Sequence, residues 1–143
     1  CGGAQALCDK YSIGMQVHEA DVPLLSSAIN LELKNSLGLD MPPKPESILS
    51  HHQIIETGDL KLQVLHTPGH TQGSICLLNQ KTLFSGDTLF FGSIGRTDLP
   101  GGDFSQIKQS LSFLMEFPED MQVLPGHGEN TTIGQEKRIN PFL

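Results

Sequence analysis

The chain has 143 residues, of which 37% are hydrophobic and 17% are charged, a composition typical of one folded domain and unlike that of a disordered tail. Its 16 Asp and Glu residues outnumber 9 Lys and Arg residues, and the formal charge of −7 disfavours nucleic acid as a partner because it repels phosphate. No apolar stretch approaches the roughly 18 to 20 residues that span a bilayer, which argues against a membrane partner, and three cysteines without paired spacing favour a reduced, cytoplasmic setting.

The first 50 residues alternate between helix and strand signals. Residues 2–11 predict a short helix and residues 15–18 a buried strand. Residues 19–29 predict a second helix, with Pro23 near its start, where the missing N–H costs little. Residues 39–50 carry three prolines and predict an extended connection rather than a boundary between domains.

Two hairpins follow, because the apolar residues change to an alternating pattern. Residues 53–56 and 60–65 flank a Thr-Gly-Asp turn, and residues 74–78 and 82–84 flank an Asn-Gln-Lys turn. We therefore expect two pairs of antiparallel strands in this part of the chain.

Residues 103–117 carry the strongest helix pattern of the sequence. Four apolar residues at steps of three and four predict the face that meets the core: Phe104, Ile107, Leu111 and Leu114. Asp103 with Gln106 resembles a capping box, and Pro118 ends the helix.

The end of the chain predicts a short buried strand over residues 121–124 and a last helix capped by Thr132, with Gln135 three residues later. Strands that come as hairpins interrupted by helices are typical of an α/β mixture with a mixed sheet. The whole chain, residues 1–143, is expected to form a single domain.

Three predicted strands are followed by the same short pattern. At each of them a glycine follows the strand, and the next residue is a strong metal ligand: His70, Asp87 and His127. One such His or Asp would be ordinary turn chemistry. Three in one short domain, two of them in the same Pro-Gly-His triplet, predict a shared metal centre at the end of a sheet.

The residues around these positions resemble a known superfamily. Residues 67–74, 84–90 and 125–128 resemble the third, fourth and fifth motifs of the metallo-β-lactamase-fold hydrolases, and residues 92–103 and 131–142 resemble its small glyoxalase II-like branch. The resemblance implies a four-layer αββα sandwich, of which this chain would form the C-terminal two-thirds as an N-terminally incomplete domain.

The resemblance also implies the chemistry. His70 and His127 would each bind one of two divalent ions, Asp87 would bridge them, and a metal-bound hydroxide would attack the substrate. Zinc is the first choice of metal, with iron or manganese as alternatives. The substrate would be a small thioester such as an S-acylglutathione, and its negative charge would need local cations. Candidates for that role are Arg96, Lys137 and Arg138.

The sequence departs from the family at one place. The first ligand motif, His-x-His-x-Asp-His, does not occur, and Cys1-Gly2-Gly3 resembles the residues that follow it. Each ion would then keep one His and a share of one carboxyl group, short of the three protein ligands usual in catalytic sites. We therefore expect the polypeptide as written to bind metal weakly or not at all, to be inactive although its intact parent is a hydrolase, and to self-associate through the sheet edge left unpaired.

Two other functions stay open. Residues 95–98, Gly-Arg-Thr-Asp, also resemble an iron-dependent persulfide dioxygenase branch of the superfamily, so oxygen chemistry is an alternative to hydrolysis. The third alternative is a non-catalytic scaffold that kept the fold and lost the chemistry. The identity of the bound metal distinguishes hydrolysis from dioxygenation.

Overall fold

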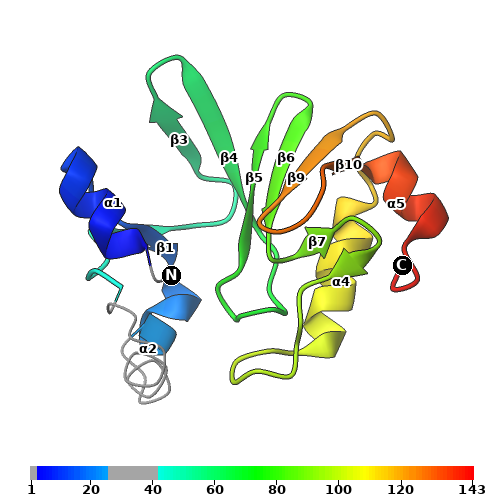
Figure 1. Ribbon diagram of the computed structural model, residues 1–143, viewed down its shortest axis with the longest axis horizontal. Helices are drawn as coiled ribbons and strands as arrows, with labels where there is room; N and C mark the ends of the chain where they lie inside the picture. Colours follow the sequence, from blue (N-terminus) through cyan, green and yellow to red (C-terminus); the bar gives the residue numbers. More distant parts are fainter. Residues whose placement is uncertain (1–2, 26–41) are drawn as a thin grey trace. The chain divides into compact units, whose positions relative to one another are not determined.

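The computed structural model describes residues 3–25 and 42–143. The chain divides into two compact units, Cys1–Leu49 and Ser50–Leu143, each built from helices and strands (Figure 1). The mixed α/β class is thereby confirmed, whereas one domain over residues 1–143 stays a prediction. No helix within the described residues is long and apolar enough to cross a membrane.

The first unit is a small parallel strand pair with short helices. Its elements are α1 (Ala4–Tyr11), β1 (Gln16–His18), the 3₁₀ helix η1 (Glu19–Asp21), α2 (Val22–Leu25) and β2 (Ser47–Leu49). The predicted helix at the start and the strand after it both form, but the strand is not buried as expected: Gln16 is exposed and His18 alone in it is buried. β2 was expected as extended connection only, because a three-residue strand after a proline-rich stretch has no visible alternation; it pairs in parallel with β1, Gln16 opposite Ser47.

The second predicted helix begins differently from the expectation. It opens as η1, whose first turn is capped by the His18 ring accepting the Ala20 N–H at 3.3 Å, and continues as one turn of α2. Pro23 stands near the start of α2, as predicted. Residues 26–29 of the predicted helix, and residues 39–41 of the predicted connection, lie outside the described residues.

The second unit is built on one mixed sheet. Its elements are β3 (Ile54–Thr57), β4 (Leu60–His66), β5 (Ile75–Asn79), β6 (Thr82–Gly86), β7 (Leu89–Phe90), β8 (Ser93–Ile94), α4 (Phe104–Leu114), β9 (Gln122–Pro125), β10 (Thr131–Thr132) and α5 (Ile133–Ile139). Six strands lie in the order β10-β9-β6-β5-β4-β3, and β7 and β8 form a separate hairpin. All neighbours in the large sheet are antiparallel except β6 and β9, which run parallel (Figure 1).

Both predicted hairpins are confirmed as β3–β4 and β5–β6. The helix over residues 103–117 is confirmed as α4, although it ends at Leu114. Pro118 has no N–H to donate to the Leu114 carbonyl, which accepts from the Phe117 N–H at 3.2 Å instead. Asp103 caps it, its carboxyl group accepting the Gln106 N–H at 2.9 Å. The cap of α5 is confirmed too, since the Thr132 hydroxyl accepts the Gln135 N–H at 3.1 Å.

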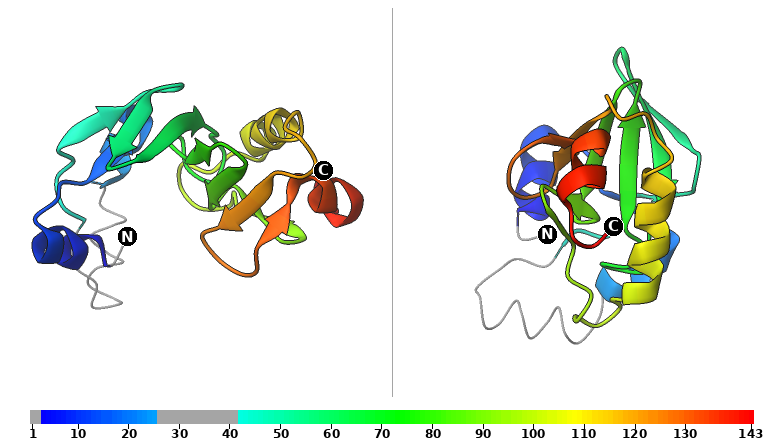
Figure 2. Two further views of the ribbon diagram at one scale, coloured as in Figure 1. Left: turned by 90° about the horizontal axis from the view of Figure 1, so that it is seen from above. Right: turned by 90° about the vertical axis from the view of Figure 1, so that its right-hand side faces the viewer.

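The core of the second unit lies between α4 and the sheet, and Figure 2 shows the helix along one face of the strands. The buried face of α4 is supplied by Ile107, Leu111 and Leu114, as predicted, and packs in one cluster with buried side chains of β4, β5, β6 and β9. Phe104 was wrongly predicted as a member: 53% of it is exposed. It is the first residue of the helix, and the backbone just before it is tied to the turn after β4 rather than to the sheet, by the Asp103 N–H donating to the Gly69 carbonyl.

Candidate metal centre

His70 leaves the end of β4 through a turn that only glycine allows. Gly69 has φ +140°, and a Cβ there would collide with the backbone of Ile107. The turn is held from both sides, because the Gly69 N–H donates to the Thr71 carbonyl at 2.9 Å and the Ser110 hydroxyl donates to the Pro68 carbonyl at 2.7 Å. Core packing of α4 therefore fixes where His70 stands.

Asp87 and His127 follow two adjacent parallel strands, β6 and β9. The Gly126 N–H donates to the Gly86 carbonyl at 2.8 Å, which locks the two strand ends together. Gly86 has φ +51°, and a Cβ on Gly126 would lie 2.7 Å from the Asp87 Oδ1 atom. The glycine before His127 thus leaves the space that the Asp87 carboxyl group occupies.

The three side chains meet around the Asp87 carboxyl group. His127 Nδ1 lies 2.9 Å from Asp87 Oδ1, and His70 Nε2 lies 3.6 Å from Asp87 Oδ2. Each carboxyl oxygen therefore faces one imidazole. The side chain of His127 is 77% exposed, against 22% for His70, so His127 is the member that can move most easily.

The backbone carbonyl of Arg96 sets the orientation of His70. It lies 2.9 Å from His70 Nδ1, and because a carbonyl oxygen can only accept, Nδ1 carries the proton. In the neutral ring the lone pair is then on Nε2, the atom that faces Asp87. A second group that holds the far nitrogen of a histidine is the usual companion of a metal-binding imidazole.

The side chains at this site are of the types that bind a divalent ion, but they are fewer than such an ion requires. Two imidazoles and a carboxyl group suit zinc, iron or manganese. Two such donors about 2.1 Å from one tetrahedral ion stand about 3.4 Å apart, so the His70–Asp87 spacing has room for an ion, whereas the hydrogen-bonded His127–Asp87 pair would have to open. Within residues 3–25 and 42–143, no three His, Cys, Asp or Glu side chains are arranged to hold a metal ion.

Two of the three predicted cations, Arg96 and Arg138, have acidic partners. The Arg96 guanidinium binds both oxygens of Asp98, with Nε–Oδ1 and Nη2–Oδ2 distances of 2.8 and 2.6 Å, and this pairing lowers the pKa of Asp98 to about 2. Arg138 Nη1 lies 3.6 Å from Glu119 Oε2, and Lys137 is exposed on α5. Their role toward a substrate stays a prediction, as does metal ligation by the three residues above.

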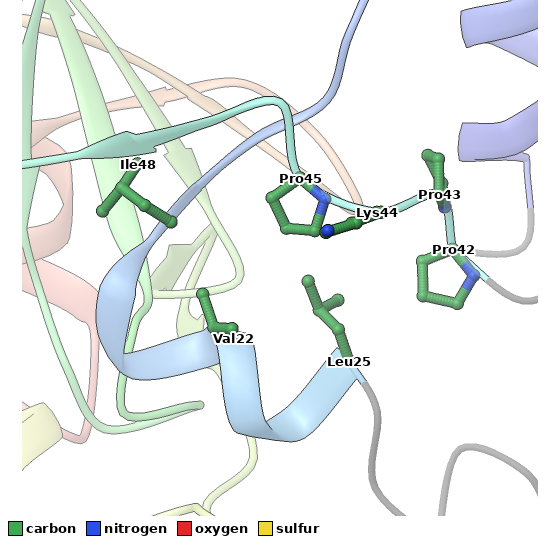
Figure 3. Close-up of a pocket in the computed structure, with 7 residues that line it drawn as sticks. All are labelled: Val22, Leu25, Pro42, Pro43, Lys44, Pro45 and Ile48. Atoms are coloured by element: carbon green, nitrogen blue, oxygen red, sulfur yellow. The ribbon is translucent and has the colours of Figure 1, made fainter.

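The first unit contains a pocket of a different kind, shown in Figure 3. Val22, Leu25 and Ile48 line it together with the prolines of residues 42–45. Among the lining residues that the structure describes, Lys44 is the charged one, and the others are apolar side chains and prolines. The described part of this lining suits apolar groups.

Comparison with known proteins identifies the class. The sequence profile described as the metallo-beta-lactamase superfamily matches residues 1–127, and the chain belongs to this superfamily. Its members are metallo-hydrolases that bind divalent metals. The fold class read from the sequence, and the resemblance to this superfamily, are therefore confirmed.

Three known proteins show how far the likeness extends. The chain is 45% identical to hydroxyacylglutathione hydrolase GloC of Haemophilus influenzae over 94 residues, which cover 64% of this chain and 44% of GloC. The crystal structure of the BLEG-1 B3 metallo-beta-lactamase matches 99% of this chain and 70% of its own at 36% identity, with a TM-score of 0.88. The di-iron-bound structure of TTHA1623 matches 99% and 71% at 38% identity, with a TM-score of 0.87. The aligned region is thus less than half of GloC.

Proposed function

We propose that this chain carries the His70, Asp87 and His127 ligands of a metal-dependent hydrolase for thioesters such as an S-acylglutathione. One observation carries the proposal: two imidazoles from different strand ends face the two oxygens of one carboxyl group. The likeness to GloC, whose name states hydrolysis of hydroxyacylglutathione, supports the thioester class.

The roles of the three residues follow from their surroundings. Two divalent ions, when bound, supply an acidified water and polarise the carbonyl of the substrate. Asp87 would bridge them, because its two oxygens already point to different imidazoles. His70 arrives with its proton fixed on the far nitrogen, so it binds as a neutral ligand without a change of tautomer. None of the three serves as the base.

The number of ligands limits what the 143-residue polypeptide can do. Two imidazoles and one shared carboxyl group supply fewer donors than two catalytic ions require, since three protein ligands for each ion are usual. We propose that a His-x-His-x-Asp-His segment, which the 143 residues do not contain, completes the site. The polypeptide of Cys1–Leu143 alone binds metal weakly and turns over no substrate.

Arg96 is the cation best placed to meet an anionic thioester. Its own carbonyl touches His70, so its side chain starts beside the proposed centre. The ion pair with Asp98 is exposed on both sides, and pairs of this kind contribute little to stability in water. A substrate carboxylate can therefore replace Asp98 at small cost. Lys137 and Arg138 are further candidates for the same role.

Persulfide dioxygenation is the second candidate function. The Gly-Arg-Thr-Asp sequence of residues 95–98 favours it by resemblance, and the di-iron form of TTHA1623 shows that a protein of this fold can bind iron. The metal content and the consumption of oxygen separate this candidate from hydrolysis.

The test compares the 143-residue polypeptide with a version that has a His-x-His-x-Asp-His segment added before Cys1. We expect the extended version to bind two divalent ions and to cleave an S-acylglutathione, and His70→Ala or His127→Ala to abolish both. A thioester assay, a β-lactam assay and an oxygen electrode with a persulfide substrate are run in parallel. Metal binding without thioester cleavage would overturn the thioester proposal. Oxygen uptake with bound iron would establish the dioxygenase in its place.

Replacing Arg96 tests the substrate role. Arg96→Gln in the extended version should raise KM for an anionic thioester more than for a neutral ester, because only the first uses the guanidinium. Lys61→Gln is the control, since Lys61 is an exposed cation paired with Glu56 at 2.7 Å on the β3–β4 hairpin. Equal changes of KM for the two substrates would remove Arg96 from the site.

We propose self-association of the 143-residue polypeptide through a sheet edge. Among the described strands β3 ends the larger sheet, and Ile54 on it is 50% exposed. An edge strand with exposed apolar residues invites pairing with a second copy. Light scattering after size-exclusion chromatography should show dimers or larger species. A stable monomer of 15.5 kDa across the concentration range would contradict the proposal.

A further inference from the structure

A completely buried carboxyl group lies in α5, outside the proposed metal centre. Glu136 is 0% exposed, and its two oxygens accept three hydrogen bonds. The Thr131 hydroxyl donates to Oε1 at 2.6 Å, while the Asn140 side-chain amide and the Gly92 N–H donate to Oε2 at 2.8 and 2.9 Å. A buried carboxyl group is costly unless its partners are in place, so these contacts depend on one another.

Two hydrogen bonds join Glu136 and Asn140 to the β7–β8 hairpin. Glu136 holds the N–H of Gly92, and the Asn140 amide also donates to the Ser93 carbonyl at 3.1 Å. The N–H of Gly92 in the turn and the carbonyl of Ser93, the first residue of β8, are thereby bound by two side chains four residues apart. We call Glu136 and Asn140 the α5 clamp.

The clamped hairpin touches His127. Phe90 pairs with Ser93 across β7 and β8, so the clamp acts on the residue directly opposite Phe90. The Phe90 ring meets the His127 ring edge to face, with centroids 5.9 Å apart and planes at 87°. His127 is mostly exposed, and this ring contact and the bond to Asp87 are the interactions that orient it in the described structure.

The hairpin also leads to the group that orients His70. β8 ends at Ile94, and the Gly95 N–H donates to the Thr88 carbonyl at 3.3 Å just before Arg96 presents its carbonyl to His70. A Cβ on Gly95 would collide with the Asp87 carbonyl, so this return of the chain runs against the residue that bears the central carboxyl group.

We propose that Glu136 and Asn140 are positioning residues: by clamping the β7–β8 hairpin they set the orientation of the His127 ring and support the return of the chain to Arg96. The role of these rings as ligands rests on the proposed function, whereas their orientation in the metal-free chain does not. The proposal assigns a role to residues 131–142, a segment that contains none of the three candidate ligands.

The first test uses NMR on the metal-free 143-residue polypeptide. The imidazole signals are followed by long-range ¹H–¹⁵N correlation, and the His127 signal is assigned by its loss in His127→Gln. Glu136→Leu removes the carboxyl oxygens that accept from Thr131, Asn140 and Gly92, and it should shift the His127 ring signals. The His66 ring, which bonds to the Gln72 carbonyl at 2.9 Å, should keep its signals.

Glu136→Gln is the conservative variant that should restore the parent spectrum. Its amide oxygen can accept from Gly92 and Asn140, and its NH₂ group can donate to the Thr131 hydroxyl, which accepts as well as donates. Leu114→Ala is the matched control, because it damages the same unit at a fully buried position without touching the clamp. It should leave the His127 signals in place.

Three outcomes would overturn the proposal. They are unchanged His127 signals in a folded Glu136→Leu variant, an equal shift in Leu114→Ala, and a failure of Glu136→Gln to restore the spectrum. If Glu136→Leu does not fold, Asn140→Ala takes its place; it removes the bond to the Ser93 carbonyl and should shift His127 in the same direction, and no shift would again overturn the proposal.

A second test separates the clamp from the proposed function. In the version extended by the His-x-His-x-Asp-His segment, Glu136→Leu should lower the affinity for Zn²⁺ by 10- to 100-fold, the range known for groups that orient ligands. Zn²⁺ binding that is absent even in the extended parent would refute the metal centre and leave the NMR result standing. Binding that is present and unchanged by Glu136→Leu would refute the clamp alone.

Discussion

Alkaline pH should destabilise the fold through one buried thiol. Cys76 lies in β5 and is 0% exposed, with its sulfur 3.3 Å from the Thr67 hydroxyl oxygen and 3.6 Å from the Ser85 carbonyl oxygen. Burial raises its pKa from 9.0 to about 11, because the thiolate would lose its hydration; the hydrogen bonds from Thr67 and Thr88 lower the pKa and only partly offset this effect.

The sign and size of the effect follow from linkage. Between about pH 9 and pH 11 the unfolded thiol loses its proton while the folded thiol keeps it, so the unfolded state binds fewer protons and stability falls as pH rises. The contribution is fully present below pH 9 and is lost as pH approaches 11. Two pKa units at about 1.4 kcal/mol each give a loss of roughly 3 kcal/mol.

Urea unfolding of the parent and of Cys76→Ala, under reducing conditions and at intervals from about pH 8 to pH 11, measures this loss. The alanine variant starts lower because it leaves a cavity, so the slopes against pH are compared rather than the stabilities themselves. All other residues are the same in both proteins, so their contributions cancel. Parallel slopes for parent and variant would refute the reasoning.

Three further predictions concern the turns and the surface. Asp103→Ala should lower the free energy of unfolding by about 1 kcal/mol, because the N-cap of α4 is lost, whereas Ser105→Ala on its exposed side should not; urea unfolding of both checks this, and equal effects would contradict the cap. Gly69→Ala should cost far more than Gly58→Ala in the same assay, since both glycines have positive φ but only Gly69 has no space for a Cβ; similar losses would contradict that reading of the turn. The contribution of the exposed Arg96–Asp98 pair should be present above the usual Asp pKa of 3.8 and vanish as pH falls toward about 2; in Arg96→Gln the Asp98 carboxyl group should titrate nearer 3.8 by NMR, and an unchanged titration would show that the pair is not formed in solution.

Local sequence patterns predicted the elements whose cause is local. The β3–β4 and β5–β6 hairpins carry their turn residues and their alternation in one short stretch, and α4 carries both its cap and its apolar face. β2, β7, β8 and β10 are strands of two or three residues, too short for a period to be seen, and β2 and β10 pair with partners that no tight turn announces. Phe104 fits the helical period but lies at the helix start, where the period no longer determines burial.

In the candidate site too, some residues could be predicted from a local sequence pattern and others could not. His70, Asp87 and His127 were predictable because imidazole and carboxyl groups after a strand and a glycine have a sequence signature. The groups that orient them have none. The Arg96 carbonyl that holds His70 exists at every residue, and its usefulness comes only from the path of the chain after β8.

The side chain and the backbone carbonyl of Arg96 must be tested by different substitutions. Replacing the Arg96 side chain tests binding of an anionic substrate but leaves the carbonyl, and therefore the orientation of His70, in place. The carbonyl can be moved only through residues that hold the surrounding backbone. Glu136 and Asn140 are such residues, because they bind the β7–β8 hairpin that precedes Arg96. Substitutions on α5 should therefore alter metal binding where substitution of Arg96 itself does not, although α5 lies beyond the last of the three ligands in the chain.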